Sequence, residues 1–268
     1  MTHKLVAENV GHTFQVKGES VVAMQNMSFH AREQEFVTFV GPSGSGKSTL
    51  FNVLAGLLTP SRGDVFVNGE AITGTPHPAL GYVLQKDLLL PWRTLIDNVV
   101  LGLEVRGVPK REAYERARPL FARYRLEGFE DQYPHSLSGG MRQRAALMRT
   151  LVLDPEVVLM DEAYKALDYP LKIELESDLL ATVKSLHKTV VFVTHDIEEA
   201  VTLSDRVYVL KARPGEIVKE ITVDLGIDST DVAERRTSPR FNDYYEQIWR
   251  SIADGNYSRS NGKSGVAA

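Results

Sequence analysis

The stretch EFVTFVGPSGSGKSTLFNVLAGLL, residues 35–58, decides the fold class of this chain. Its opening EFVTFV (35–40) is rich in Val and Phe and predicts a buried strand, and the apolar residues of LFNVLAGLL (50–58) recur with the period of a helix. A glycine-rich turn, GPSGSGKST (41–49), joins the two. Because a strand, a turn and a helix in this order make half of a βαβ unit, we expect an α/β fold.

The turn matches the G-x-x-x-x-G-K-[ST] pattern of a phosphate-binding loop at Gly41, Gly46, Lys47 and Ser48. Its glycines let backbone N–H groups turn inward around an anion, and the helix N-terminus adds its positive dipole. Lys47 would place a charge at the β- and γ-phosphates, and the Ser48 hydroxyl oxygen would bind Mg²⁺. We expect nucleotide binding here rather than a merely flexible turn, although kinases and GTPases share the pattern. The candidate nucleotide-binding residues of the loop are Gly41, Pro42, Ser43, Gly44, Ser45, Gly46, Lys47, Ser48 and Thr49.

Composition narrows the class of protein. The 268 residues are 43% hydrophobic and 25% charged, which suits one large globular domain or a domain with an inserted lobe. The net charge of −4 argues against a nucleic-acid partner, because DNA-binding domains are usually basic. The absence of cysteine excludes disulfides, thiolate catalysis and cysteine-ligated metals. The sequence has no run of about 18 apolar residues and its start lacks the apolar core of a signal peptide, so we expect a soluble cytoplasmic protein.

Further strands and a helical lobe complete the predicted organisation. Short strands are expected in DVFVNG (64–69), LGYVLQ (80–85), EVVLMD (156–161), TVVFVTH (189–195) and RVYVLKA (206–212). From about residue 86 to 155 the chain turns helical. In REAYERARPLFARYRL (111–126) one helix face is predicted to carry Tyr114, Ala117, Leu120, Phe121 and Tyr124. An α/β core interrupted by a helical lobe is therefore expected.

Beyond Asp224 the sequence becomes polar, with one exception. FNDYYEQIWRSI (241–252) carries an apolar stripe with helical spacing, which we expect to pack back on the core. The final SRSNGKSGVAA (258–268) has the composition of a disordered tail.

A second glycine motif, LSGGMRQR (137–144), precedes another strongly helical segment. Ser138 is a plausible N-cap, and Gly139 and Gly140 would expose backbone donors at the helix start. Alternatively, the motif is the flexible entry to an ordinary capped helix and binds no anion. Two anion-binding helix starts on different lobes are more than one mononucleotide needs. The strand EVVLMD also ends on two carboxylates, Asp161 and Glu162, which suit phosphate chemistry or, alternatively, a helix start favoured by the dipole.

Four motifs in this order, GPSGSGKST, LSGGMRQR, MDEAYKALD (160–168) and VTHD (193–196), resemble the ATP-binding subunit of an ABC transporter over about residues 4–225. The resemblance implies an α/β P-loop NTPase core with an N-terminal antiparallel β subdomain and an α-helical subdomain inserted at about 86–155. It divides the chain into an ATPase domain, 1–225, and a C-terminal extension, 226–268, with one short helix and a disordered tail. In that family two subunits pack head to tail, and each LSGG motif closes over ATP held by the partner's phosphate loop. A second ATPase subunit, identical or not, is therefore implied.

The same resemblance assigns catalytic roles, with Lys47 at the phosphates. Glu162 would polarise the water that attacks the γ-phosphate, and His195 would reach that phosphate. Gln85, otherwise an ordinary polar strand end, would touch both Mg²⁺ and the attacking water. Asp161 would join Ser48 and Gln85 around the metal ion. ATP and Mg²⁺ are thus the implied substrate and cofactor, and ATP hydrolysis to ADP and phosphate is the implied reaction.

The remaining family roles concern nucleotide contacts and the dimer. Phe14 stands where the family stacks an aromatic ring on adenine; a core or turn phenylalanine is the alternative. Asp168 resembles the aspartate that signals across the dimer, and Ser138 would reach the partner's ATP together with its two glycines. Lys165 departs from the family, which usually has Gly or Ser there. It is either a solvated substitution or pairs with a carboxylate of a non-identical partner.

Three further segments resemble the nitrate, sulfonate and taurine importer branch: QKDLLLPWRTLIDNV (85–99), DIEEAVTLSDRVYVL (196–210) and ARPGEIVKEITVDL (212–225). This branch implies two separate transmembrane permease subunits and, indirectly, a solute-binding protein, with the ATPase at the cytoplasmic face of the bacterial inner membrane. Trp92 would help seat a permease coupling helix or, alternatively, lie in the core. Other possibilities are a cytosolic ABC ATPase without a transport role, the ATPase of an exporter or lipid transporter, and a plain P-loop kinase or GTPase.

Overall fold

The computed structural model describes residues 2–72, 74–162 and 169–257. The larger of its two sheets has six strands in the order β10-β9-β3-β8-β7-β6. Neighbouring strands from β9 to β6 run parallel, and β10 is antiparallel to β9. The parallel strands read as nearly continuous apolar runs because helices cover both faces of such a sheet. The bounds are β3 (Phe36–Val40), β6 (Leu80–Val83), β7 (Val157–Asp161), β8 (Thr189–Thr194), β9 (Arg206–Lys211) and β10 (Glu216–Thr222).

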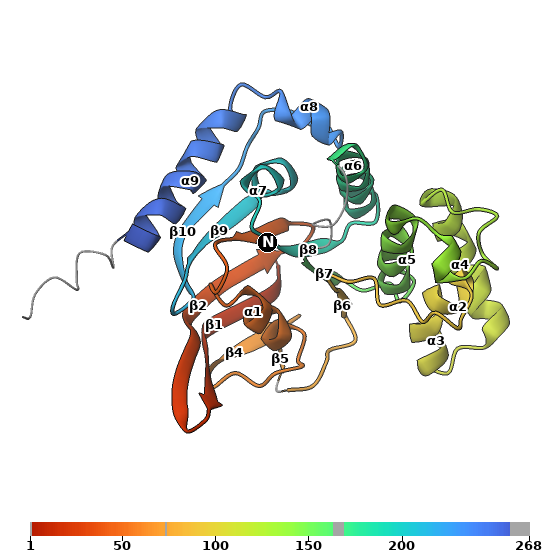
Figure 1. The fold of residues 1–268 in the computed structure, drawn as a ribbon, viewed down its shortest axis with the longest axis horizontal. Helices are drawn as coiled ribbons and strands as arrows, with labels where there is room; N and C mark the ends of the chain where they lie inside the picture. Colours follow the sequence, from red (N-terminus) through yellow and green to blue (C-terminus); the bar gives the residue numbers. More distant parts are fainter. Residues whose placement is uncertain (1, 73, 163–168, 258–268) are drawn as a thin grey trace, which may run out of the picture.

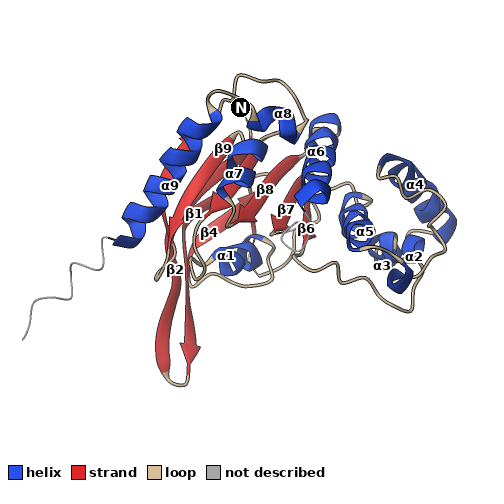
Figure 2. Cartoon of the chain, turned by 45° about the horizontal axis from the view of Figure 1, so that its top comes forward, coloured by secondary structure: helices blue, strands red, loops and turns tan. Residues whose placement is uncertain are grey.

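A second, antiparallel sheet has the order β2-β1-β4-β5. Its strands are β1 (His3–Val16), β2 (Glu19–Arg32), β4 (Arg62–Val67) and β5 (Glu70–Ile72). The β1–β2 hairpin extends well beyond the rest of the sheet (Figure 2). This is the expected N-terminal antiparallel β subdomain, built beside the α/β core.

Helix α1 (Lys47–Leu54) lies between the two sheets. Its apolar residues Leu50, Phe51 and Leu54 are fully buried and share one core with residues of both sheets, for example Val10 of β1 and Val191 of β8. This packing fixes the start of α1, and with it the preceding glycine-rich turn, against the end of β3.

The helical lobe extends to one side of the sheets (Figure 1). It contains α2 (Leu95–Val99), α3 (Leu101–Val105), α4 (Lys110–Arg123), the 3-10 turn η1 (Pro134–Ser136) and α5 (Gly139–Leu151). In α4, Ala117 and Phe121 are buried, as is Tyr124 at its C-cap, which confirms the predicted apolar face. Tyr114 lies at the edge of that face, where its hydroxyl donates to Asp97 at 2.6 Å.

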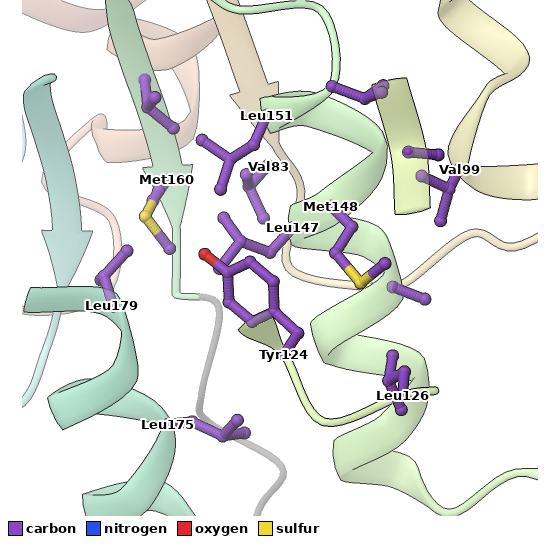
Figure 3. Packing of buried hydrophobic residues seen from close by; sticks show 14 of the residues in the cluster. Val83, Val99, Tyr124, Leu126, Leu147, Met148, Leu151, Met160, Leu175 and Leu179 are labelled. Atoms are coloured by element: carbon purple, nitrogen blue, oxygen red, sulfur yellow. The ribbon is translucent and has the colours of Figure 1, made fainter. Parts of the chain in front are cut away.

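Helix α6 (Tyr169–Ser185) joins the lobe to the large sheet. Figure 3 shows Tyr124 of the lobe packed among Leu147 of α5, Met160 of β7, and Leu175 and Leu179 of α6. The Tyr124 hydroxyl donates to the Thr182 hydroxyl of α6 at 2.9 Å, so this buried phenol has a polar partner.

The end of the chain returns to the core. It forms α8 (Val232–Arg236) and α9 (Phe241–Tyr257), and α9 packs on α7 (Ile197–Leu203) and β9. Ile248 is fully buried there, with Phe241, Tyr244, Tyr245 and Ile252 packed around it. The predicted apolar stripe packs on the core as expected, but the extension forms two helices, one of them 17 residues long, where one short helix was expected. In the part of the chain that the structure describes, none of the helices is both long and apolar enough to cross a bilayer.

Candidate active site

The phosphate loop lies between β3 and the first turn of α1. Gly44 and Gly46 have φ values of 80° and 78°, the left-handed region that glycine enters without strain. The Lys47 side chain folds back along the loop, and its Nζ donates to the carbonyl oxygens of Gly41 at 2.8 Å and Pro42 at 3.0 Å. Among the described residues no side chain caps α1, and its first turn is free of acidic residues, so the helix dipole is not opposed there.

This arrangement fits a phosphate group. A buried lysine, an uncapped helix start and glycines in left-handed conformation are the parts from which anion-binding loops are built. Ser43, Gly44 and Ser48 are exposed at the loop surface. The other predicted loop residues support it from beneath or from the side: Gly41, Ser45 and Lys47 are buried, and Pro42, Gly46 and Thr49 are half-buried.

Glu162 follows β7 and is the centre of the predicted catalytic group. Its Oε1 lies 3.1 Å from Nδ1 of His195, and its Oε2 accepts a hydrogen bond from Nε2 of Gln85 at 3.3 Å. These side chains come from the ends of β8, β7 and β6, which are neighbours in the parallel part of the sheet. The carboxyl ends of parallel strands meet at one edge, where open α/β sheets bind their ligands. The phosphate loop follows β3 at the same edge.

The backbone of Glu162 is held in an unusual conformation. Its φ is 40°, which a side chain with a Cβ adopts only at a cost, and its N–H donates to the carbonyl oxygen of Val193 at 3.0 Å. The Glu162 side chain is 15% exposed and that of His195 is 47% exposed. A largely buried carboxylate therefore faces an accessible imidazole, an arrangement suited to proton transfer from water near a phosphate.

Three predicted magnesium ligands offer oxygen donors of the kind Mg²⁺ prefers. They are the Ser48 hydroxyl, the Gln85 amide and the Asp161 carboxylate, the last at the end of β7. The negative charge of Asp161 also acts on a neighbouring strand: burial first, and this charge second, raise the pKa of the Tyr82 hydroxyl on β6. Within the described residues no three His, Asp or Glu side chains form a metal cluster by themselves. A cation here would be held by the Ser48, Gln85 and Asp161 oxygens together with nucleotide phosphates, which suits Mg²⁺ bound with its substrate.

The LSGG motif begins α5 in the helical lobe. Ser138 is its N-cap, and its hydroxyl oxygen accepts the N–H of Met141 at 3.3 Å. Ser138 and Gly139 are exposed, whereas Gly140 is buried. In both ribbon views α5 lies in the lobe, apart from α1 (Figures 1 and 2). The structure therefore places the two helix starts that were predicted to bind anions in different parts of the molecule.

Two aromatic side chains, each open to a core interpretation from sequence, lie at the surface. Phe14 lies on the β1–β2 hairpin, is 39% exposed and makes an edge contact with His12, so it belongs neither to the core nor to a turn. Trp92 is 71% exposed, so the core alternative is wrong for it as well. Asp168 and Lys165 lie outside the described residues, and the interpretations of both stay predictions.

One group of charges near His195 has no counterpart among the sequence predictions. We call it the buried charge cluster: Lys172 and Glu176 of α6, Asp196 at the N-cap of α7, Glu199 of α7, and Arg236 of α8. Charged residues are almost never fully buried unless they are paired. The sequence signal was limited to Glu176 on an otherwise apolar face of α6, beside Leu175 and Leu179.

Comparison with known proteins decides the family. The model of the family described as ABC transporter matches residues 24–165, more than half of the chain. The chain belongs to this family. It is an ATP-binding subunit of an ABC transporter, an ATPase coupled to transmembrane transport.

Several relatives align over nearly the whole ABC subunit. An uncharacterized ABC transporter ATP-binding protein, MJ0412 of Methanocaldococcus jannaschii, is 45% identical, with 95% of this chain and 93% of that protein covered. The nitrate import ATP-binding protein NrtD of Synechocystis sp. is 40% identical, with 90% and 91% covered. The taurine import ATP-binding protein TauB of Roseobacter denitrificans is 37% identical, with 98% and 99% covered.

A solved structure supports the fold and the reaction. The ABC subunit superposes with a TM-score of 0.73 on the ATP-binding cassette MJ0796 in a dimeric post-hydrolysis state bound to ADP and Pi. The two chains are 31% identical, and the match covers 82% of this chain and 99% of the other. The predicted fold class, an ABC ATPase, is confirmed.

Proposed function

We propose that this ATP-binding subunit drives import of a small solute, such as nitrate, a sulfonate or taurine, through two separate permease subunits. The observation that carries the hydrolytic part is the placement of Glu162 between Gln85 and His195, at the sheet edge that also bears the phosphate loop. The import direction is supported by the similarity to NrtD and TauB, whose names specify nitrate and taurine import.

In the proposed reaction the loop residues hold the phosphates of ATP, and Lys47 neutralises charge on the β- and γ-phosphates. Mg²⁺, held by Ser48, Gln85 and Asp161, supplies further charge neutralisation when bound. Glu162 accepts the hydrogen bond of a water molecule and withdraws its proton as the oxygen attacks the γ-phosphorus. The bond to ADP breaks, and ADP and phosphate are released.

Gln85 and His195 orient the reacting groups on either side of Glu162. The Gln85 amide N–H donates to Glu162, which orients the carboxylate, and the amide oxygen at the other end of the group could then hold the metal ion. The 47% exposed His195 side chain is accessible to the γ-phosphate. Positioning and charge neutralisation are the main sources of catalysis in phosphoryl transfer.

The separation of α1 from α5 supports a composite site in a head-to-tail dimer. In this arrangement Phe14 and the phosphate loop hold one ATP, while Ser138, Gly139, Gly140 and Asp168 act on the ATP of a second ATPase subunit. The exposed position of Ser138 and Gly139 favours contact with another chain over a role inside this one.

A rigid surface segment is proposed to receive the permease. It follows Gln85 and exposes Leu88 (53%) and Trp92 (71%). The side chain of buried Asn98 fixes the backbone of this segment by hydrogen bonds. Its Oδ1 accepts the N–H of Leu90 at 2.6 Å, and its Nδ2 donates to the carbonyl oxygens of Leu90, Arg93 and Thr94. Exposed apolar side chains on a fixed backbone are typical of a protein interface. The subunit would then lie at the cytoplasmic face of the bacterial inner membrane as a peripheral component.

To test this function, the complex would be isolated from membranes through a tag on this chain, and its permease and solute-binding partner would be identified. ATP hydrolysis by the complex in liposomes would then be measured with each candidate solute. We expect a permease to co-purify and one small solute to stimulate hydrolysis. Recovery of this subunit without any membrane protein would contradict the transport role and leave a cytosolic ATPase.

A further inference from the structure

The short helix α8 of the C-terminal extension packs against both α6 and α7 (Figure 1). Its last residue, Arg236, makes the polar link between them. The Nη1 atom donates to the Tyr169 hydroxyl at the start of α6 at 2.6 Å and lies 2.9 Å from Oε2 of Glu198 in the first turn of α7. The guanidinium also lies over the Tyr169 ring, 5.4 Å from its centroid. One side chain thus ties the beginnings of two helices together.

Next to Arg236 lies the carboxyl group of Glu176, whose burial costs free energy. Glu176 is fully buried, and its carboxylate oxygens accept no hydrogen bond from any described residue. Arg236 Nη2 lies 3.5 Å from one oxygen, and Lys172 Nζ lies 3.8 Å from the other. Since a buried carboxyl without partners is costly, these cations offset part of that cost and hold α8 on α6.

Lys172 continues the connection to the segment that carries His195. Its Nζ lies 2.6 Å from Oδ2 of Asp196 and 2.7 Å from Oε1 of Glu199. Asp196 caps α7 by accepting the N–H of Glu198 at 2.9 Å, and Glu199 accepts a hydrogen bond from the Thr194 hydroxyl. Thr194 and Asp196 are the two neighbours of His195 in the chain. The residues on both sides of the histidine are therefore joined by their side chains to the buried charge cluster.

We propose that Arg236 is a positioning residue of the ATPase: by joining Tyr169 of α6 to Glu198 of α7, it holds the start of α7 in place and so keeps His195 against Glu162. The inference rests on the proposed roles of those two residues in hydrolysis. Arginine suits the task because its planar fork reaches several acceptors at once, whereas lysine provides a single point of charge. The C-terminal extension thereby becomes part of what sets the hydrolytic rate.

A purely structural role for Arg236 predicts different kinetics. Loss of a stabilising contact lowers the melting temperature but leaves kcat unchanged well below it. Loss of a positioning contact lowers kcat and leaves KM for ATP nearly unchanged, because α8 packs on α6 and α7 whereas α1, which follows the phosphate loop, packs on β2 and β7. The split between kcat and KM therefore separates the two.

The experiment uses the purified full-length chain and measures phosphate release against ATP concentration, with the melting temperature of each variant. Residues remote from a site typically change its coupling severalfold, so for Arg236→Gln we expect kcat to fall about 3–20-fold with KM within about twofold of wild type. Arg236→Lys should restore part of the loss. Tyr169→Phe removes one hydroxyl from a 61% exposed side chain, which is compatible with folding, and should lower kcat in the same direction.

Arg240→Gln is the matched control. Arg240 lies on the same extension, and its side chain is 54% exposed. Its Nη1 donates to the carboxylate of Asp224 at 2.7 Å and to the Asp224 carbonyl oxygen at 3.2 Å, and Asp224 belongs to neither α6 nor α7. Wild-type kcat in both Arg236→Gln and Tyr169→Phe would overturn the proposal, as would an equal loss in Arg240→Gln. If Arg236→Gln does not fold, wild-type kcat in Tyr169→Phe alone overturns it. A separate result would contradict the proposed function itself: hydrolysis by Glu162→Gln at the wild-type rate would show that Glu162 does not activate the water.

Discussion

The Nδ1 atom of His195 lies 3.1 Å from Oε1 of Glu162, although 33 residues separate them in the chain. The pair forms because β7 and β8 are adjacent parallel strands and each residue follows the end of its strand. A carboxylate and an imidazole are thereby fixed at the same sheet edge as the phosphate loop. We therefore predict that the histidine is essential to turnover but not to the binding of the phosphates.

His195→Ala should therefore lower kcat by about 100-fold or more, the usual cost of removing one group that stabilises charge on the reacting centre, with a small change in KM. Steady-state phosphate release measures both constants. His187→Ala is the control, because His187 is also exposed and contacts Gln34 at the start of the neighbouring strands. Equal activity of the two variants would rule out the assigned role.

Trp92→Ala should leave ATP hydrolysis and stability of the isolated chain unchanged, because the side chain is 71% exposed. We expect it to weaken permease binding by about 30-fold, the effect of losing one interface hot spot. Co-purification from membranes and solute uptake are the measurements. Trp249→Ala, at a 58% exposed tryptophan on α9, should behave as wild type in both. Normal assembly of the Trp92 variant would refute the docking surface.

Asn98→Ala should destabilise the helical lobe. The side chain is fully buried and satisfies one backbone N–H and the carbonyl oxygens of Leu90, Arg93 and Thr94, which would lose their partner. We expect the free energy of unfolding to fall by about 2–4 kcal/mol, as for buried polar groups left unsatisfied. Urea denaturation provides the number. Asn68→Ala, which removes one exposed hydrogen bond to Glu156 at 3.2 Å, should cost much less.

Glu176 should give the protein a pH-dependent stability. Burial, together with the nearby charge of Glu199, raises the pKa of its carboxyl from 4.5 to about 8, while Lys172 and Arg236 oppose the shift. Below the unfolded pKa both states hold the proton, and the contribution is fully present. As the pH rises toward the folded value only the unfolded state has released its proton, so stability is progressively lost.

Glu176→Gln removes this titration. The variant should match wild type most closely near pH 5 and exceed it by about 2–4 kcal/mol near pH 8, since each pH unit in this window is worth up to about 1.4 kcal/mol. Urea denaturation of both proteins across this range measures the difference. If the free energies of unfolding of the two proteins differ by the same amount at every pH from 5 to 8, the Glu176 carboxyl does not hold its proton in the folded state.

The phosphate loop and the central strands could be predicted from sequence because their signals are local. The nine residues from Gly41 to Thr49 specify a turn whose glycines need left-handed backbone, and the strands around it are short apolar runs. The catalytic group was placed through family resemblance, and the structure brings Gln85, Glu162 and His195 together as that resemblance implied.

Other features depend on tertiary structure and left weak signals. The long strand β1 was not located from its periodicity, because its pairing is irregular near Asn9, which has a φ of 50°, and this interrupts the alternation of apolar and polar residues. The helix α8 is only five residues long, and the role of Arg236 appears only when residues 169, 176, 198 and 236 meet in space. No residue spacing along the chain encodes that meeting.

The central claim is that Glu162 activates the water that hydrolyses ATP, and Glu162→Gln tests it most directly. The amide has nearly the same shape but cannot accept the proton. The account predicts ATP binding within about threefold of wild type, measured by equilibrium titration, and phosphate release reduced by about 100-fold or more. Phosphate release at the wild-type rate, with ATP still bound, would contradict it.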